Sequence, residues 1–96
     1  MGINDILKDK REEILRIAQR HGVRHLKVFG SVARGEADEG SDVDFLIEVG
    51  GPTTPWFPGG LVAELEQLLG RRVDVVEADA LREVVRDRVL NEAIPL

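Results

Sequence analysis

The segment from Gly30 to Asp44 constrains the fold most, because it places a polar, glycine-punctuated stretch between two apolar runs. The first run, Val23 to Phe29, is typical of a β-strand and leads directly into Gly30-Ser31. The second run, Asp42 to Val49, also predicts a strand and ends at a Gly-Gly-Pro sequence. A sheet that contains both strands therefore carries this polar stretch at one of its ends.

Two aspartates open the second predicted strand. Side chains alternate between the faces of a strand, so Asp42 and Asp44 point to one face and Val43 to the other. Neighbouring carboxylates repel each other unless a cation lies between them, and all-oxygen sites favour Mg²⁺. The alternative is that this Asp-x-Asp pair is only a solvated face or part of a turn.

A third carboxylate, Asp74, lies in the apolar run Val73 to Val76, where aspartate has poor strand propensity. If this third strand pairs beside the second, three carboxylates can converge on one place. Three is the number needed to hold two metal ions with bridging ligands.

The dipeptide Gly30-Ser31 is a candidate phosphate-binding turn. Glycine lets a ligand approach the backbone, and the serine offers a hydroxyl and N–H groups to an anion. The competing interpretation is an ordinary strand-to-helix turn. Arg34 is the only basic residue from 28 to 50, and it either pairs with the surrounding acids or reaches phosphate, so it joins the nucleotide-binding candidates.

Helices complete the predicted pattern. Apolar residues at three- and four-residue steps predict an amphipathic helix over 3–21, a second helix is expected over 61–69, and a last one over 79–91. Leu81, Val84, Val85 and Val89 are expected to face inward from the last helix. The pattern predicts an α/β (α+β) fold: a small mixed sheet of three core strands with helices packed against it.

The proline-rich stretch 52–58 reads as a loop around two aromatic residues. Trp56 and Phe57 could stack on a base or touch a partner, and the sequence favours packing against the core.

Composition excludes several classes of protein. With 96 residues we expect one domain over 1–96, too small for separate substrate-binding domains. A net charge of −5 argues against direct nucleic-acid binding, and no apolar run predicts a membrane span or a signal peptide. The absence of cysteine excludes disulfides and thiolate metal sites, and we expect a cytoplasmic protein.

Together these residues resemble a known family. Gly30-Ser31, ten residues and then Asp42-x-Asp44, with Ala33-Arg34-Gly35 and Ser41 in place, are similar to the signature of the minimal nucleotidyltransferases (MNT) of the DNA polymerase β superfamily. The resemblance covers nearly the whole chain, including the third aspartate. It implies the polymerase β-like nucleotidyltransferase fold.

The resemblance also implies an activity: transfer of a nucleoside monophosphate, AMP from ATP, to an acceptor hydroxyl. Asp42, Asp44 and Asp74 would be the catalytic residues and the ligands of two Mg²⁺ ions, and Gly30 and Ser31 would seat the β and γ phosphates. Family members are paired with HEPN-domain toxins. This pairing implies an antitoxin that adenylylates a tyrosine of its partner.

Two alternatives to that function remain open. The chain could neutralise a HEPN partner by occlusion alone, with the carboxylates as relics. It could also be a transferase that acts on a small hydroxylated molecule, although it lacks the room for accessory domains.

Overall fold

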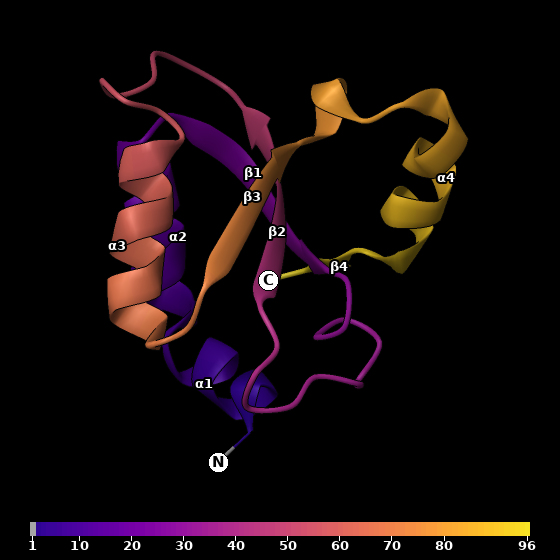
Figure 1. The fold of residues 1–96 in the computed structure, drawn as a ribbon. Helices are drawn as coiled ribbons and strands as arrows, with labels where there is room; N and C mark the ends of the chain where they lie inside the picture. Colours follow the sequence, from indigo (N-terminus) through magenta and orange to yellow (C-terminus); the bar gives the residue numbers. More distant parts are fainter. Residues whose placement is uncertain (1) are drawn as a thin grey trace.

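The computed structural model describes residues 2–96, which form a four-stranded sheet with helices around it (Figure 1). In chain order the elements are α1 Ile3–Asp9, α2 Arg11–Arg20, β1 Val23–Phe29, β2 Val43–Val49, α3 Gly59–Leu69, β3 Val73–Glu77, the 3-10 helix η1 Ala78–Ala80, α4 Glu83–Glu92 and β4 Ile94–Pro95. None of the helices in this range has the length and apolar character needed to cross a membrane.

The sheet is mixed and has the strand order β3-β2-β1-β4. Strands β1 and β2 are antiparallel and are joined by the polar stretch, while β3 returns after α3 to lie parallel to β2. The three predicted strands are thus present as a mixed sheet. The short strand β4, which the sequence analysis did not predict, extends the sheet beside β1, where Ile94 pairs with Val28.

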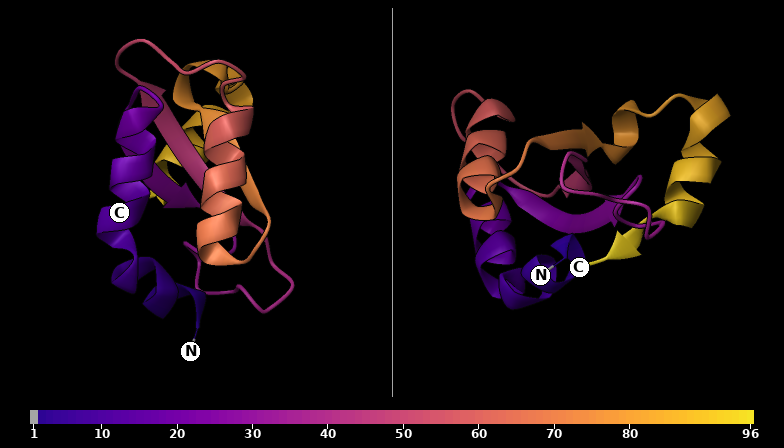
Figure 2. Two further views of the ribbon diagram at one scale, coloured as in Figure 1. Left: turned by 90° about the vertical axis from the view of Figure 1, so that its left-hand side faces the viewer. Right: turned by 60° about the horizontal axis from the view of Figure 1, so that its bottom comes forward.

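Helices α2 and α3 lie side by side on one face of the sheet, as the left view of Figure 2 shows. The side chains between them and the sheet form the core, and each large apolar side chain buried there contributes roughly 1.5–3 kcal/mol. The most deeply buried are Phe45, Ile14, Ile47, Leu61, Leu65 and Val43. Because alternate residues of β2 enter this core, Asp44 is held on the opposite face.

The predicted N-terminal helix is two helices. The chain leaves helical geometry at Lys10 (φ −104°, ψ 12°), between α1 and α2. The apolar periodicity already has a gap there, since no apolar residue lies between Leu7 and Ile14. The break allows both of these side chains to reach the core, where both are buried.

The prediction for the last helix was wrong in its start and in its packing. Helix α4 begins at Glu83 and contains no buried residue. Val84 is 92% exposed and Val85 42% exposed, while Leu81 and Val89 are half-buried, so the expected inward stripe is not buried against the sheet. Figures 1 and 2 show α4 standing beyond the sheet, on the side away from α2 and α3. Its apolar residues therefore lack a partner within the described chain.

The proline-rich loop is attached to the helical layer through a buried histidine. The ring of His21 hydrogen-bonds Thr54 of the loop and, at 3.1 Å, the carboxylate of Glu64 on α3. Phe57 packs against the core as expected. The packing prediction was wrong for Trp56, which is 89% exposed.

Candidate active site

The candidate phosphate-binding turn begins where β1 ends. Gly30 adopts φ +76°, a conformation that side chains disfavour, and backbone hydrogen bonds from Arg34 N to Gly30 O (3.1 Å) and from Glu36 N to Ser31 O (2.9 Å) close the turn. Val32 is buried and anchors the turn to the core. Residues 30–35 are a series of hydrogen-bonded turns with no regular helix.

The three predicted carboxylates come from neighbouring strands. Asp44 of β2 and Asp74 of β3 are register partners in the parallel pair. Asp42 lies directly before β2. On its other side Asp44 faces Phe29, the residue that precedes the phosphate-binding turn. The strand pairing needed for the carboxylates to converge is therefore present.

Asp44 also touches the turn itself. A Cβ added to Gly30 would overlap Oδ2 of Asp44, so the carboxylate fills the space in which a side chain at position 30 would lie. The glycine is thus required twice, for its positive φ and for this close approach. The contact joins the candidate phosphate seat to the candidate metal ligands.

The charges around Asp44 disfavour its ionised form. Partial burial raises the pKa of the Asp44 carboxyl, and the negative charges of Asp74 and Asp42 raise it further, while Arg34 acts in the opposite direction. Asp42 has a nearby cation of its own, since Nε of Arg72 lies 3.4 Å from Oδ1. A cation bound at Asp44 would therefore stabilise its ionised form.

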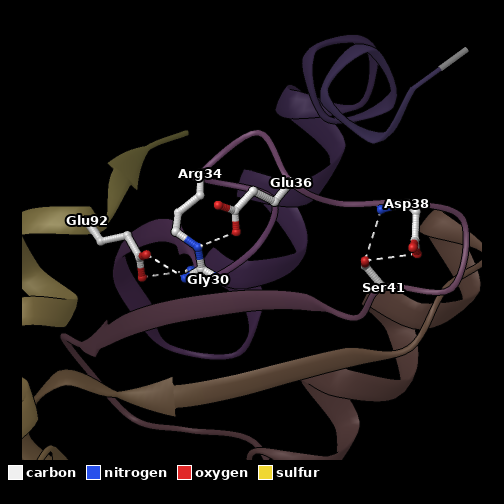
Figure 3. Close-up of polar contacts among 6 residues, drawn as sticks. All are labelled: Gly30, Arg34, Glu36, Asp38, Ser41 and Glu92. Atoms are coloured by element: carbon white, nitrogen blue, oxygen red, sulfur yellow. Dashed lines mark hydrogen bonds and ion pairs between the residues drawn. The ribbon is translucent and has the colours of Figure 1, made fainter.

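The acidic stretch between the turn and β2 is locally ordered. The Ser41 hydroxyl donates to Asp38 Oδ1 (3.1 Å), and the Asp38 N–H donates to Ser41 Oγ (3.0 Å), as Figure 3 shows. Arg71, which the sequence analysis did not select, donates to the carbonyl oxygens of Asp38 (2.6 Å) and Ser41 (3.4 Å). Arg71 precedes β3, so it ties the acidic stretch to the strand that carries Asp74.

Arg34 pairs with acids, which was one of the two roles expected for it. Its Nε lies 2.9 Å from Glu36 Oε2, and its Nη1 lies 2.6 Å from Glu92 Oε1 (Figure 3). These bonds raise the pKa of the guanidinium above its ordinary value. Glu92 also accepts a hydrogen bond from the Gly30 N–H at 3.2 Å. No sequence pattern indicated this residue, which is 58 positions from Arg34 and meets it only through the fold.

The donor chemistry fits a divalent cation. Among residues 2–96, no group of three or more His, Cys, Asp or Glu side chains is arranged to hold a metal ion as it stands. The oxygens at Asp42, Asp44 and Asp74 are nevertheless hard ligands, and their mutual repulsion at a half-buried carboxylate is what a bound Mg²⁺ relieves. These aspartates remain the predicted ligands.

A groove of about 550 Å³ opens beside the turn, away from the carboxylates. Its walls come from α1, the turn and the C-terminal segment, and they include Lys8, Arg11 and Arg34. Asp42, Asp44 and Asp74 do not line it, so this cavity and the carboxylates are separate features.

The sequence is similar to a family model and to the sequences of known proteins. A family model described as "Nucleotidyltransferase domain" matches residues 8–96. A Methanocaldococcus jannaschii protein named "Putative protein adenylyltransferase MJ0435" is 39% identical over 94 residues, which cover 98% of this chain and 97% of that protein. A Thermococcus cleftensis protein named "Protein adenylyltransferase MntA" is 39% identical over 92 residues, covering 96% and 90%.

Solved structures share the fold. One described as a "putative minimal nucleotidyltransferase" is 45% identical, with a TM-score of 0.86 over 100% of this chain and 97% of that one. A toxin–antitoxin structure with AMP-PNP is 19% identical and superposes with a TM-score of 0.74 over 88% of this chain and 69% of that one. At that identity the second likeness concerns the fold alone. The fold class predicted from the sequence is confirmed.

Proposed function

The chain belongs to the nucleotidyltransferase domain family, and from this premise we propose that it transfers AMP from ATP to an acceptor hydroxyl, as a protein adenylyltransferase. Two relatives that it matches over nearly their full length carry that name in their own descriptions. We further propose that residues 1–96 act as one catalytic domain. The acceptor in this proposal is a tyrosine of a HEPN-domain toxin, with the chain as its antitoxin.

The contact between Gly30 and Asp44 is the observation that carries the proposal. It puts the first residue of the candidate phosphate-binding turn beside a carboxylate suited to Mg²⁺. Phosphoryl and nucleotidyl transfer require these two groups together, because the cation neutralises charge on the phosphates that the turn holds. An ordinary turn has no need for an acidic side chain pressed against its glycine.

Each candidate site residue has its own role in the proposed reaction. Gly30 and Ser31 seat the phosphates, and Arg34 offsets their charge. Asp42 and Asp44 would hold Mg²⁺, which when bound would neutralise the phosphates and lower the pKa of the acceptor hydroxyl. Asp74, which is exposed on the edge strand β3, would be the third Mg²⁺ ligand and would complete the site on the acceptor side.

In the proposal, the docking of the partner protein positions the acceptor hydroxyl. The described residues form one small sheet with its helices, and in the proposal the acceptor is positioned by docking on their surface. A protein of the same fold was solved in a toxin–antitoxin structure with AMP-PNP, and by analogy with it we propose a toxin partner and a nucleotide substrate. Because the reaction consumes ATP, we propose a cytoplasmic location.

Intact-mass spectrometry tests the proposal. The chain is incubated with the HEPN-domain protein encoded next to its gene, with each of the four ribonucleoside triphosphates and with or without Mg²⁺. We expect the partner to gain one or a few AMP units from ATP only when Mg²⁺ is present. No mass gain with any nucleotide contradicts the proposal, and transfer to a small hydroxylated molecule without the partner favours the alternative transferase.

A further inference from the structure

The last residue of α4 reaches across to the turn. Glu92 places one carboxylate oxygen 3.2 Å from the Gly30 N–H and the other 2.6 Å from Nη1 of Arg34, as Figure 3 shows. The Glu92 side chain is 19% exposed and that of Arg34 is 42% exposed, so the bridge is partly shielded from solvent. One carboxylate thus bridges a backbone donor and a guanidinium at the start of the turn.

These donors are of the kind that binds phosphate. A backbone N–H at a glycine turn and an arginine side chain recognise phosphate oxygens through charge-assisted hydrogen bonds. A carboxylate offers the same negative charge and two acceptor oxygens. The hydrogen bond from Arg34 lowers the pKa of Glu92, which keeps the carboxylate in its charged form at neutral pH.

Helix α4 is held in place by few other contacts. None of its residues is buried, and a cavity of about 260 Å³ separates Leu90 from Leu46 of the sheet. Beyond Glu92, the C-terminal segment is attached through two residue pairs between β4 and β1, a hydrogen bond from Arg11 Nε to the Leu96 carbonyl oxygen and packing of Leu96 against the core, none of which involves α4 itself. Moving the helix exposes little apolar surface, so the energetic cost of releasing Glu92 is small.

We propose that Glu92 is a positioning residue that holds the phosphate-binding groups of the turn as an internal anion, and that the triphosphate of an incoming nucleotide replaces it. The inference rests on the proposed nucleotidyl transfer and adds a residue and a movement to it. Glu92 keeps Gly30 and Arg34 arranged while the site is empty. It also competes with the nucleotide for them, and its release frees α4.

Competition predicts that removal of the Glu92 charge tightens the binding of nucleotide, which a purely structural role of Glu92 does not predict. We would measure the binding of ATP with Mg²⁺, and of inorganic tripolyphosphate with Mg²⁺, by titration calorimetry for the wild type, Glu92→Gln and Glu83→Gln. Glu83 is an exposed glutamate on the same helix, so it is the matched control for charge. We expect Glu92→Gln to bind both ligands about tenfold more tightly, within the usual range of coupling between sites, and Glu83→Gln to match the wild type.

Hydrogen exchange provides a second readout in the unmodified chain. The amides of α4 should exchange faster when ATP and Mg²⁺ are bound than when the site is empty. Unchanged or weaker nucleotide binding by Glu92→Gln, or slower exchange in α4 with nucleotide, overturns the inference while leaving the proposed function intact. Failure of the wild type to bind ATP at all contradicts the proposed function and the inference together.

Discussion

The carboxylate of Asp44 occupies the space in which a side chain at position 30 would lie. These two residues are 14 positions apart and meet because β1 and β2 pair with Phe29 opposite Asp44. The phosphate-binding turn and the first carboxylate of β2 are therefore one structural unit. A side chain introduced at Gly30 would collide first with the carboxylate of Asp44.

Replacing Gly30 with alanine should lower both the stability of the fold and the rate of AMP transfer. The positive φ alone costs about 1–2 kcal/mol of stability with any side chain present, and the added Cβ must also push Asp44 aside. We expect Gly30→Ala to lose most of its AMP transfer while remaining folded. Thermal unfolding and partner mass measure the two effects.

Gly35→Ala is the matched control for this prediction. Gly35 has nearly the same φ, +74°, but nothing lies within 4 Å of a Cβ added there. It should lose only the stability that the positive φ costs and keep its transfer activity. Equal activity of the two variants would mean that the contact with Asp44 has no role in the reaction.

The charge of Asp44 should make the metal-free protein less stable as pH rises. Its pKa is raised in the folded state above the ordinary value of 3.8, so folding favours the protonated form. The contribution of Asp44 to the free energy of unfolding should fall as pH rises from below 3.8 through the native pKa and then level off. The lowered pKa values of Glu64 and Glu92 act in the opposite direction, so the Asp44 contribution is read from the difference between the wild type and Asp44→Asn. Asp44→Asn lacks this titration and should be slightly more stable at pH 7, as urea unfolding across pH 3–7 can measure. A less stable Asp44→Asn at pH 7 would indicate that Asp44 makes a favourable contact as a carboxylate.

Adding Mg²⁺ and ATP should stabilise the folded wild-type protein. A ligand that binds only the folded state at about 100 times its Kd adds about 2.7 kcal/mol to the free energy of unfolding. The wild-type melting temperature should therefore rise, and Asp42→Asn should lose most of the increase. Asp79→Asn, which removes the same charge from the exposed helix η1, should respond like the wild type. An unchanged wild-type melting temperature at millimolar ligand would contradict the two-metal site.

The exposure of α4 makes a mutation there harmless to the fold. Val85 is 42% exposed, so Val85→Asp should change the free energy of unfolding by no more than about 0.5 kcal/mol. Leu65→Asp buries an unpaired charge in the core between α3 and the sheet and should unfold the protein. Urea titration of both variants measures the contrast. A strongly destabilised Val85→Asp would mean that α4 packs on the sheet after all.

Local patterns were sufficient to predict strands β1, β2 and β3 and the neighbouring positions of Asp44 and Asp74. The run Val23 to Phe29 is strand β1 with the predicted bounds, because Gly22 and Gly30, both at positive φ, delimit it. The placement of Asp44 and Asp74 side by side also followed from alternation once β3 was taken to pair with β2. Both results depend on short-range rules that a sequence carries directly.

Other features depend on contacts that no local pattern encodes. Val84 and Val85 have the spacing of a buried helix face, yet burial needs a partner surface that the described chain does not provide. The bond between Arg34 and Glu92 joins residues 58 positions apart, and Arg71 reaches the acidic stretch over 30 or more positions. Such contacts arise from the path of the whole chain.

The central claim is tested most directly by the mass of the HEPN partner after incubation with ATP, Mg²⁺ and either the wild type, Asp44→Ala or Asp74→Ala. The wild type should add AMP to the partner. Each variant should be slower by more than about a hundredfold, because the lost carboxylate would hold the Mg²⁺ that neutralises negative charge developing only during transfer. Both variants should still copurify with the partner. Variants that modify the partner as fast as the wild type would contradict the account. A wild type that binds the partner without adding AMP would contradict it equally and would identify a binding-only antitoxin.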